Sequence, residues 1–214
     1  MLNSIEIQLT TSERKLLDSL DSPFKIQSFL DSIPYSDDEF YRCPLRVLRD
    51  RKAHCFDGAL FAAMALRQIG YQALILELIP NRRDDDHLLA LFKQFNRWGA
   101  LAQSNFTGLR YREPVYRSLR ELVMSYFEDF FNSAGEKTLA GYRGPIDLKV
   151  FDRLDWMSSD AGLEKLSTDM DRYGIRPVIS RAMAANLAPV DARSLRAGLM
   201  GANEAGLFKI DSKK

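Results

Sequence analysis

The sequence has few of the residues that bind metals or form covalent cross-links. Its 214 residues include two cysteines, Cys43 and Cys55, and two histidines, His54 and His87. Two cysteines do not make a disulfide framework. A zinc site of Cys and His would need all four residues, and their order and spacing match no standard zinc pattern. We therefore expect no disulfide scaffold, no metal and no cofactor.

An excess of charge of one sign is also lacking. The 30 basic and 29 acidic residues give a formal net charge of +1, so the composition gives no electrostatic reason to expect nucleic acid or a membrane surface as a partner. No apolar run reaches the length of a transmembrane helix, and the first nine residues lack the basic and apolar regions of a signal peptide. We therefore expect a cytoplasmic protein that binds neither nucleic acid nor membranes.

What is present is the composition of an ordinary globular domain. Hydrophobic residues make up 46% of the chain and charged residues 28%, and the length suits a single domain over residues 1–214. Residues 1–10 alternate loosely and favour an edge strand or an extended arm. Residues 11–50 carry helix-start and helix-stop signals, such as Pro23 at the start of a second helix. We expect a helical N-terminal part there.

Cys55 opens a strongly apolar run. Residues 59–69 are good helix formers and are apolar on nearly every face until Arg67, which predicts a buried helix that stops at Gly70. A cysteine in the first turn of such a helix lies where backbone N–H groups point outward and the dipole is positive, and both effects stabilise a thiolate. The competing interpretation is that Cys55 is a small, buried and unreactive residue.

After the helix the pattern changes to that of strands. The polar connection over 80–86 contains three aspartates, which we expect in a solvated loop. We expect a hairpin turn at Asn96–Arg97, and strands over 71–79, 87–95 and 98–105. The sequence thus predicts an α+β fold in which a central buried helix packs on a small antiparallel sheet, with additional helices at both ends.

The chain beyond residue 106 has weaker signals. We expect a polar connection over 107–114, a helix over 115–131, a glycine-bearing loop over 132–145, a strand or lead-in over 146–151, and helices over 162–173 and from 178 onward. Together these segments predict a mostly helical C-terminal part over residues 115–214.

A nucleophilic cysteine needs a base that reaches it through space, and the base needs an orienting partner. His54 directly precedes Cys55, and neighbours on a helix point about 100° apart, so we expect His54 at the rim of the site. His87 begins a strand that can pack on the Cys55 helix. It is therefore the better candidate for the base.

The third member of a triad should lie on the strand paired with His87. A hairpin loop of Asn96–Arg97 alone would put Ser104 on the face of His87. A loop with an odd number of residues, or a bulge at Gly99, would put Asn105 opposite His87. We favour Asn105, because its amide carbonyl can accept the imidazole N–H and fix the tautomer. Ser104 remains the alternative and could support the site.

These residues together resemble the catalytic core of the transglutaminase-like superfamily, a branch of the papain-like cysteine enzymes. In that family a nucleophilic Cys opens a helix ending in Arg-x-x-Gly, a later strand begins with the catalytic His, and a further strand often carries a Trp and ends at Asp or Asn. The matching positions within residues 44–105 are Cys55, Arg67, Gly70, His87, Trp98 and Asn105. The resemblance implies a catalytic core at about 44–106, with Cys55, His87 and Asn105 as the triad and Ser104, Trp98 and Asp86 in support.

The resemblance implies cysteine-dependent acyl transfer or hydrolysis at an amide bond of a protein or peptide. The Cys55 thiolate would attack the carbonyl carbon and His87 would protonate the departing amine; water then gives a peptidase or amidase, and a second amine gives a transglutaminase. Two departures from the family pattern favour an alternative. His54 stands where many relatives have Gly, and Leu88 follows His87 where many have an aromatic residue nearby. The alternative is a catalytically weak or inactive fold that serves as a protein-binding module, and a third interpretation leaves Cys55 in the core.

Overall fold

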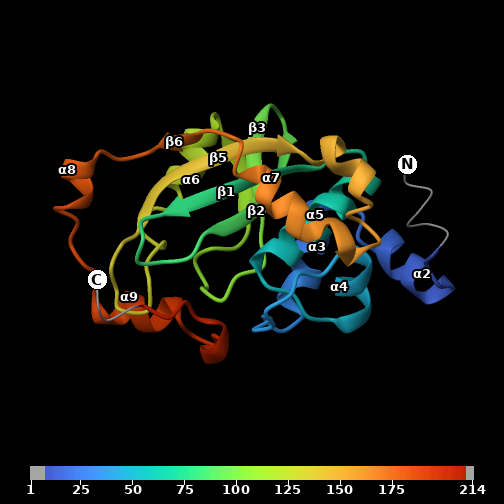
Figure 1. The fold of residues 1–214 in the computed structure, drawn as a ribbon, viewed down its shortest axis with the longest axis horizontal. Coiled ribbons are helices and arrows are strands. Elements are labelled where there is room, and N and C mark those ends of the chain that lie inside the picture. The colour runs from blue at the N-terminus through green and yellow to red at the C-terminus, as the bar shows by residue number, and fades with distance from the viewer. Residues whose placement is uncertain (1–7, 211–214) are drawn as a thin grey trace.

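The computed structural model describes residues 8–210, so the extended arm or edge strand expected over residues 1–10 lies mostly outside the described residues. Along the chain the helices and strands are α2 (Thr11–Ser19), α3 (Pro23–Asp31), α4 (Pro44–Asp50), α5 (Cys55–Gln68), β1 (Leu74–Pro80), β2 (His87–Gln94), β3 (Arg97–Leu101), β4 (Arg112–Tyr116), α6 (Leu119–Met124), β5 (Leu139–Asp147), η1 (Leu148–Leu154), η2 (Asp160–Gly162), α7 (Leu163–Met170), β6 (Ile175–Pro177), α8 (Arg181–Ala184), α9 (Ala192–Gly198) and η3 (Glu204–Gly206). Figure 1 shows α3, α4 and α5 grouped together, away from α8 and α9.

The sheet has six strands in the order β4-β3-β2-β1-β5-β6, and every neighbouring pair is antiparallel. Helices pack on it, so the α+β class predicted from the sequence is confirmed. Alternate residues of the central strands face opposite sides. Leu88 and Ala90 pack with α5 on one face, whereas Leu89 and Leu91 pack on the other with residues that follow β4.

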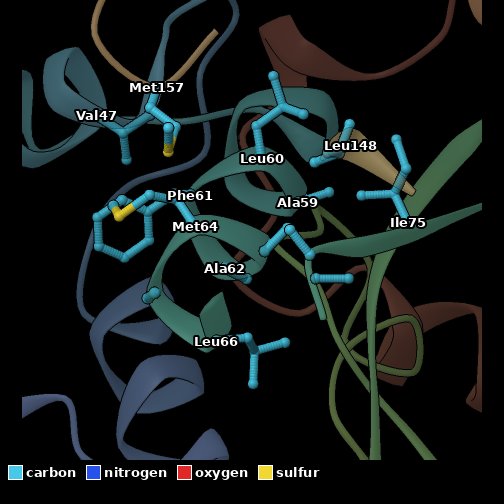
Figure 2. Close-up of a cluster of buried hydrophobic side chains, with 14 of the residues drawn as sticks. Val47, Ala59, Leu60, Phe61, Ala62, Met64, Leu66, Ile75, Leu148 and Met157 are labelled. Carbon is cyan, nitrogen blue, oxygen red and sulfur yellow. The ribbon is translucent and has the colours of Figure 1, made fainter. Parts of the chain in front are cut away.

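Helix α5 is the central element of the first face. Every residue from Phe56 to Leu66 is buried, and Figure 2 shows its side chains meeting neighbours from several other segments, among them Val47, Met157 and Ile75. Because a helix that is apolar on all sides has no face to turn toward water, it is surrounded by protein. The buried helix predicted from the sequence is confirmed, with Cys55 as its first residue.

The hairpin between β2 and β3 differs from both predicted registers. Gln94 pairs with Arg97, so the turn is Phe95–Asn96, one residue earlier than the predicted Asn96–Arg97. Both turn residues have positive φ angles, 50° and 58°, the combination that a two-residue hairpin turn of type I′ requires. The prediction failed because phenylalanine is not a residue that signals this conformation. The ladder ends at Ala90–Leu101, before it reaches His87.

The part over residues 115–214 is less helical than predicted, because strands occupy two of its segments. β4 takes the start of the predicted helix over 115–131, and β5 lies where a glycine-bearing loop was predicted. Gly141 in β5 is needed for packing, because a Cβ there would lie 2.9 Å from the Arg176 carbonyl oxygen on β6. A glycine that permits close approach of two strands resembles a loop signal in the sequence. Of the predicted helices, the one over 162–173 is present as α7, the one over 115–131 is shortened to α6, and the segment from 178 onward contains the short helices α8 and α9.

Within residues 8–210, no helix is both long enough and apolar enough to span a membrane. The location in the cytoplasm stays a prediction.

The close packing of α5 against Gln103 can be tested at Gly58, which lies in the first turns of the helix. A Cβ at this position would overlap the Cβ of Gln103, whereas helix propensity alone would favour alanine by about 1 kcal/mol. We expect Gly58→Ala to destabilise the protein by about 1–3 kcal/mol, the usual cost of overpacking, in urea denaturation. Gly174→Ala is the control, since a Cβ there meets nothing within 4 Å. A stabilised Gly58→Ala variant would contradict the close approach.

Candidate functional site

Cys55 occupies the first position of α5, and His54 caps the helix. The His54 Nδ1 accepts a hydrogen bond from the Phe56 N–H (3.2 Å), and the His54 N–H donates to Asp57 Oδ2 (3.4 Å). These two bonds satisfy N–H groups that a helix start otherwise leaves without partners. His54 thus acts on Cys55 through the helix start that it stabilises. Burial lowers the pKa of His54 to about 4, so it is neutral at pH 7.

The Cys55 thiol faces a cavity but is surrounded by protein on its other sides. Its Sγ lies 4.0 Å from the Asp86 carbonyl oxygen. Burial raises the pKa of Cys55 well above its ordinary value, and the carboxylates of Asp86 and Asp85 raise it further. The thiolate expected from the helix N-terminus is therefore not the resting form, and Cys55 is a neutral thiol in this arrangement.

His87 begins β2 and is 5% exposed. Because side chains alternate along a strand, His87 shares the face of Leu89 and Leu91, on the side of the sheet away from α5. Its Nε2 lies 2.8 Å from the Leu109 carbonyl oxygen and donates to it. Burial lowers the pKa of His87 to about 4. His87 is thus a neutral imidazole, and its described hydrogen-bond partner is Leu109.

The two candidates for the third triad position also have partners of their own. The Asn105 Nδ2 donates to the Asn203 carbonyl oxygen (2.8 Å), and the Asn203 N–H donates to Asn105 Oδ1 (2.7 Å). The Ser104 Oγ accepts from the Phe106 N–H (3.0 Å). In the described part of the chain, neither side chain has a hydrogen bond to His87.

Two adjoining cavities contain these residues. The larger, of about 400 Å³, is lined by Cys55 and His54 among others, and the smaller, of about 60 Å³, is lined by His87, Ser104 and Asn105. The residues common to both walls are Tyr35, Asp85, Asp86, Gly206, Leu207 and Phe208. The structure therefore brings His87 and Asn105 into one cavity and Cys55 into its neighbour, with a shared wall between them.

The other two supporting residues lie in different surroundings. Asp86 is in the shared wall, where burial raises its pKa, as does its contact with Glu77. Glu77 is itself buried and paired with Arg143, at 2.5 Å. Trp98 pairs with Tyr116 across β3 and β4, and the Lys93 Nζ lies 5.1 Å from its ring centre. Trp98 packs with the face of the sheet opposite α5.

Tyr35 is a site residue that sequence reasoning missed. It forms a bridge with Ala53, two residues before Cys55, and it lines both cavities. Burial raises the pKa of Tyr35 well above its ordinary value; the adjacent Cys55 side chain raises it further, while the Cys55 N–H, which donates to the Tyr35 hydroxyl oxygen, lowers it. In the sequence Tyr35 follows Pro34 and indicated only the end of a helix.

Sequence reasoning also missed the lining of the larger cavity. Its carboxyl groups are Asp37, Asp38, Glu77, Asp85, Asp86 and Asp171, and no Lys or Arg is among the described lining residues. In residues 8–210, no group of three or more His, Cys, Asp or Glu side chains is placed to hold a metal ion. The cavity is therefore an acidic space beside a thiol.

No family model matches the sequence, and no curated protein matches it. Among solved structures, two distant likenesses are to LapG of Legionella pneumophila. A structure described as EGTA-treated is 17% identical over 47% of this chain and 67% of that chain, with a TM-score of 0.34. A second LapG structure is 14% identical over 72% of this chain and 92% of that chain, with a TM-score of 0.41. With TM-scores below 0.5, these likenesses carry no argument about function.

The lowered pKa of His87 predicts a stability change with pH. The unfolded chain protonates this residue near pH 6.5 and the folded protein only near pH 4. Between these values the unfolded state binds more protons, so stability is full above pH 6.5 and is lost as the pH falls toward 4. We expect His87→Gln to lose about 2 kcal/mol less than the unmodified protein between pH 7 and pH 5, by urea denaturation. Equal losses in the two proteins would show that His87 is not buried as a neutral ring.

Proposed function

We propose that this protein is a transglutaminase-like, papain-like cysteine enzyme that transfers or hydrolyses acyl groups at amide bonds of a protein or peptide. One observation carries the proposal. Cys55 is the first residue of the buried helix α5 and lies on the wall of a cavity of about 400 Å³. A rigid helix start that presents a thiol to a cavity is the placement that covalent catalysis requires.

The neutral Cys55 thiol and the neutral His87 ring decide how the first step, proton transfer from the thiol, proceeds. Cys55 holds its proton because burial raises its pKa, and His87 is neutral because burial lowers its pKa to about 4, so both shifts oppose proton transfer from the thiol to the imidazole in the described arrangement. His87 acts as a general base only after the site opens, because contact between the two groups and renewed hydration bring their pKa values closer together. Since the two residues line adjoining cavities, the shared wall must rearrange for this transfer.

The remaining steps are those of ordinary acyl transfer. The Cys55 sulfur forms a bond to the carbonyl carbon, and the carbonyl electrons move to oxygen. The Cys55 N–H, once the Tyr35 hydroxyl oxygen has left it, and the positive end of α5 stabilise this charge. The protonated His87 then gives its proton to the leaving nitrogen as the C–N bond breaks. Water or an amine resolves the resulting thioester. Asn105 orients the imidazole in the active arrangement.

The acidic lining supports a preference among substrates. Six carboxyl groups line the cavity at Cys55, and no Lys or Arg is among its described lining residues. Much of this charge is neutralised nearby, because Asp37 and Asp38 pair with Lys52, Asp38 also pairs with Arg42, and Glu77 and Asp171 pair with Arg143. Burial raises the pKa of Asp85, and raises that of Asp86 to about 8, so the negative field that attracts cations comes mainly from Asp85. We propose that the amide substrate carries basic side chains next to the reacting bond.

Acylation by an activated ester tests the nucleophile. With p-nitrophenyl acetate we expect an acetyl group on Cys55, located by peptide mass spectrometry. We expect His87→Ala to slow acylation by about a hundredfold, the lower range for loss of a general base. Cys43→Ala is the matched control, because Cys43 is 3% exposed and lines neither the Cys55 cavity nor the His87 cavity. Acetylation that is unchanged in His87→Ala would contradict the proposed base.

Peptide binding tests the electrostatic preference. We expect the Cys55→Ala protein to bind a Lys-containing peptide about tenfold more tightly than the Glu-containing peptide of the same length at low salt, since each charge pair contributes about 1 kcal/mol. The difference should shrink as salt is added and in the Asp85→Asn variant, measured by fluorescence anisotropy. Equal affinity for the two peptides would remove the preference.

The same experiments address the alternative, a protein-binding module. The raised pKa of Cys55 and the separate hydrogen bonds of His87 and Asn105 favour it. A binding module would take up the basic peptide without acylation at Cys55. An enzyme shows both.

A further inference from the structure

We infer that residues 203–208, named here the strap, hold the site in a resting state by fixing Asn105 and forming part of the wall between the two cavities. The inference rests on the proposed function, since it concerns how the Cys55 and His87 cavities are kept apart. In Figure 1 the red ribbon after α9 leads back toward the N-terminal helices.

Asn203 is the anchor of the strap. Its backbone makes two hydrogen bonds to the Asn105 side chain, and its own Nδ2 donates to the Tyr35 carbonyl oxygen (3.2 Å). The paired bonds turn the Asn105 amide toward Asn203. One residue thus binds both a wall of the Cys55 cavity and the amide that the triad needs, although these lie far apart in the sequence.

The rest of the strap forms part of the wall between the two cavities. Gly206, Leu207 and Phe208 line both cavities. Gly206 lies against Tyr35 so closely that a Cβ on it would be 3.1 Å from Cδ1 and 3.2 Å from Cε1 of the tyrosine ring. Tyr35 in turn lies beside Cys55. The strap therefore lies against Tyr35, the residue next to the thiol, and leaves it little room to move toward Gly206.

Hydrogen bonds, more than burial, hold the strap in place. Phe208 is 40% exposed, and the flanking helix α9 is attached at one edge, where its Ala197 and Gly198 carbonyl oxygens accept hydrogen bonds from Thr107. Segments with little apolar burial open at low free energy while the core stays folded. The strap can therefore leave without unfolding of the sheet or of α5.

Release of the strap would change the hydrogen bonds and contacts of Asn105 and Tyr35. When Asn203 leaves, the Asn105 amide is free to turn toward His87, which lines the same small cavity. Tyr35 loses both its hydrogen bond to Asn203 and the contact with Gly206 that limits its movement. The wall shared by the two cavities then loses three of its residues, and substrate can reach the thiol.

Two variants of the full chain release the strap by independent routes. Asn203→Pro removes the N–H that binds Asn105, and the Asn203 φ of −77° is compatible with proline. Asn203→Ala is its matched control, because it keeps that N–H. Gly206→Val places a side chain against Tyr35. Glu204→Gln alters an exposed side chain of the same segment and serves as the second control.

The readout is the rate of Cys55 alkylation by iodoacetamide at pH 7, with Cys43 measured in the same sample. We expect Asn203→Pro and Gly206→Val to raise the Cys55 rate about tenfold, as loss of one or two net hydrogen bonds shifts a local opening. Asn203→Ala should raise it less, and Glu204→Gln should leave it unchanged. Rates at Cys55 equal to those of the unmodified protein would overturn the inference. An equal rise at the buried Cys43 would also overturn it, because it reports unfolding of the core.

Alkylation needs no catalysis, so this result is separate from the proposed function. Faster alkylation with no acylation by p-nitrophenyl acetate in any variant would support the strap and reject the enzyme. Acylation of the unmodified protein at the same rate as Asn203→Pro would support the enzyme and reject the strap.

Discussion

The approach of α5 to the segment after β3 fixes the position of Cys55. Gly58 leaves no room for a Cβ against Gln103, and the Gln103 Nε2 donates to the Ile33 carbonyl oxygen (3.0 Å). Gln27 holds the same segment through two hydrogen bonds to the Ala102 backbone. Because α5 is buried on all sides, its first turn cannot shift relative to this segment without disturbing the core. The thiol is therefore held by the core, and the surrounding loops and strap are free to vary.

Burial also decides the protonation states of Cys55 and His87. A helix N-terminus stabilises an anion by about 0.3–1 kcal/mol at exposed positions, whereas burial can shift a pKa by about 3–5 units. Desolvation is thus the larger effect on Cys55, and neighbouring carboxylates act in the same direction. His87 is also kept neutral by burial. A neutral thiol and a neutral imidazole make a resting pair that requires contact before a proton moves.

Local sequence signals predicted the parts of the fold that depend on local structure. The apolar run after Cys55 predicted α5, and the strand pattern from residue 87 predicted β2. The β2–β3 register could not be predicted, since it depends on a positive φ at Phe95 that no residue preference signals. Tyr35 and Asn203 could not be placed at the site, because their contacts join residues separated by 168 positions. Long-range polar contacts leave no local pattern in a sequence, whereas a buried helix such as α5 leaves a run of apolar helix formers.

The groups proposed for catalysis are all satisfied by backbone in the described structure. His87 donates to the Leu109 carbonyl, Ser104 accepts from the Phe106 N–H, and Asn105 is paired with the backbone of Asn203. Assembling a triad would exchange these hydrogen bonds for others of similar strength, so the exchange itself costs little. The larger cost lies in moving Asn203 and Tyr35, which join the walls of both cavities. A partner or substrate that binds the displaced strap could therefore supply the free energy for assembly, because only differential binding to the open state shifts such an equilibrium.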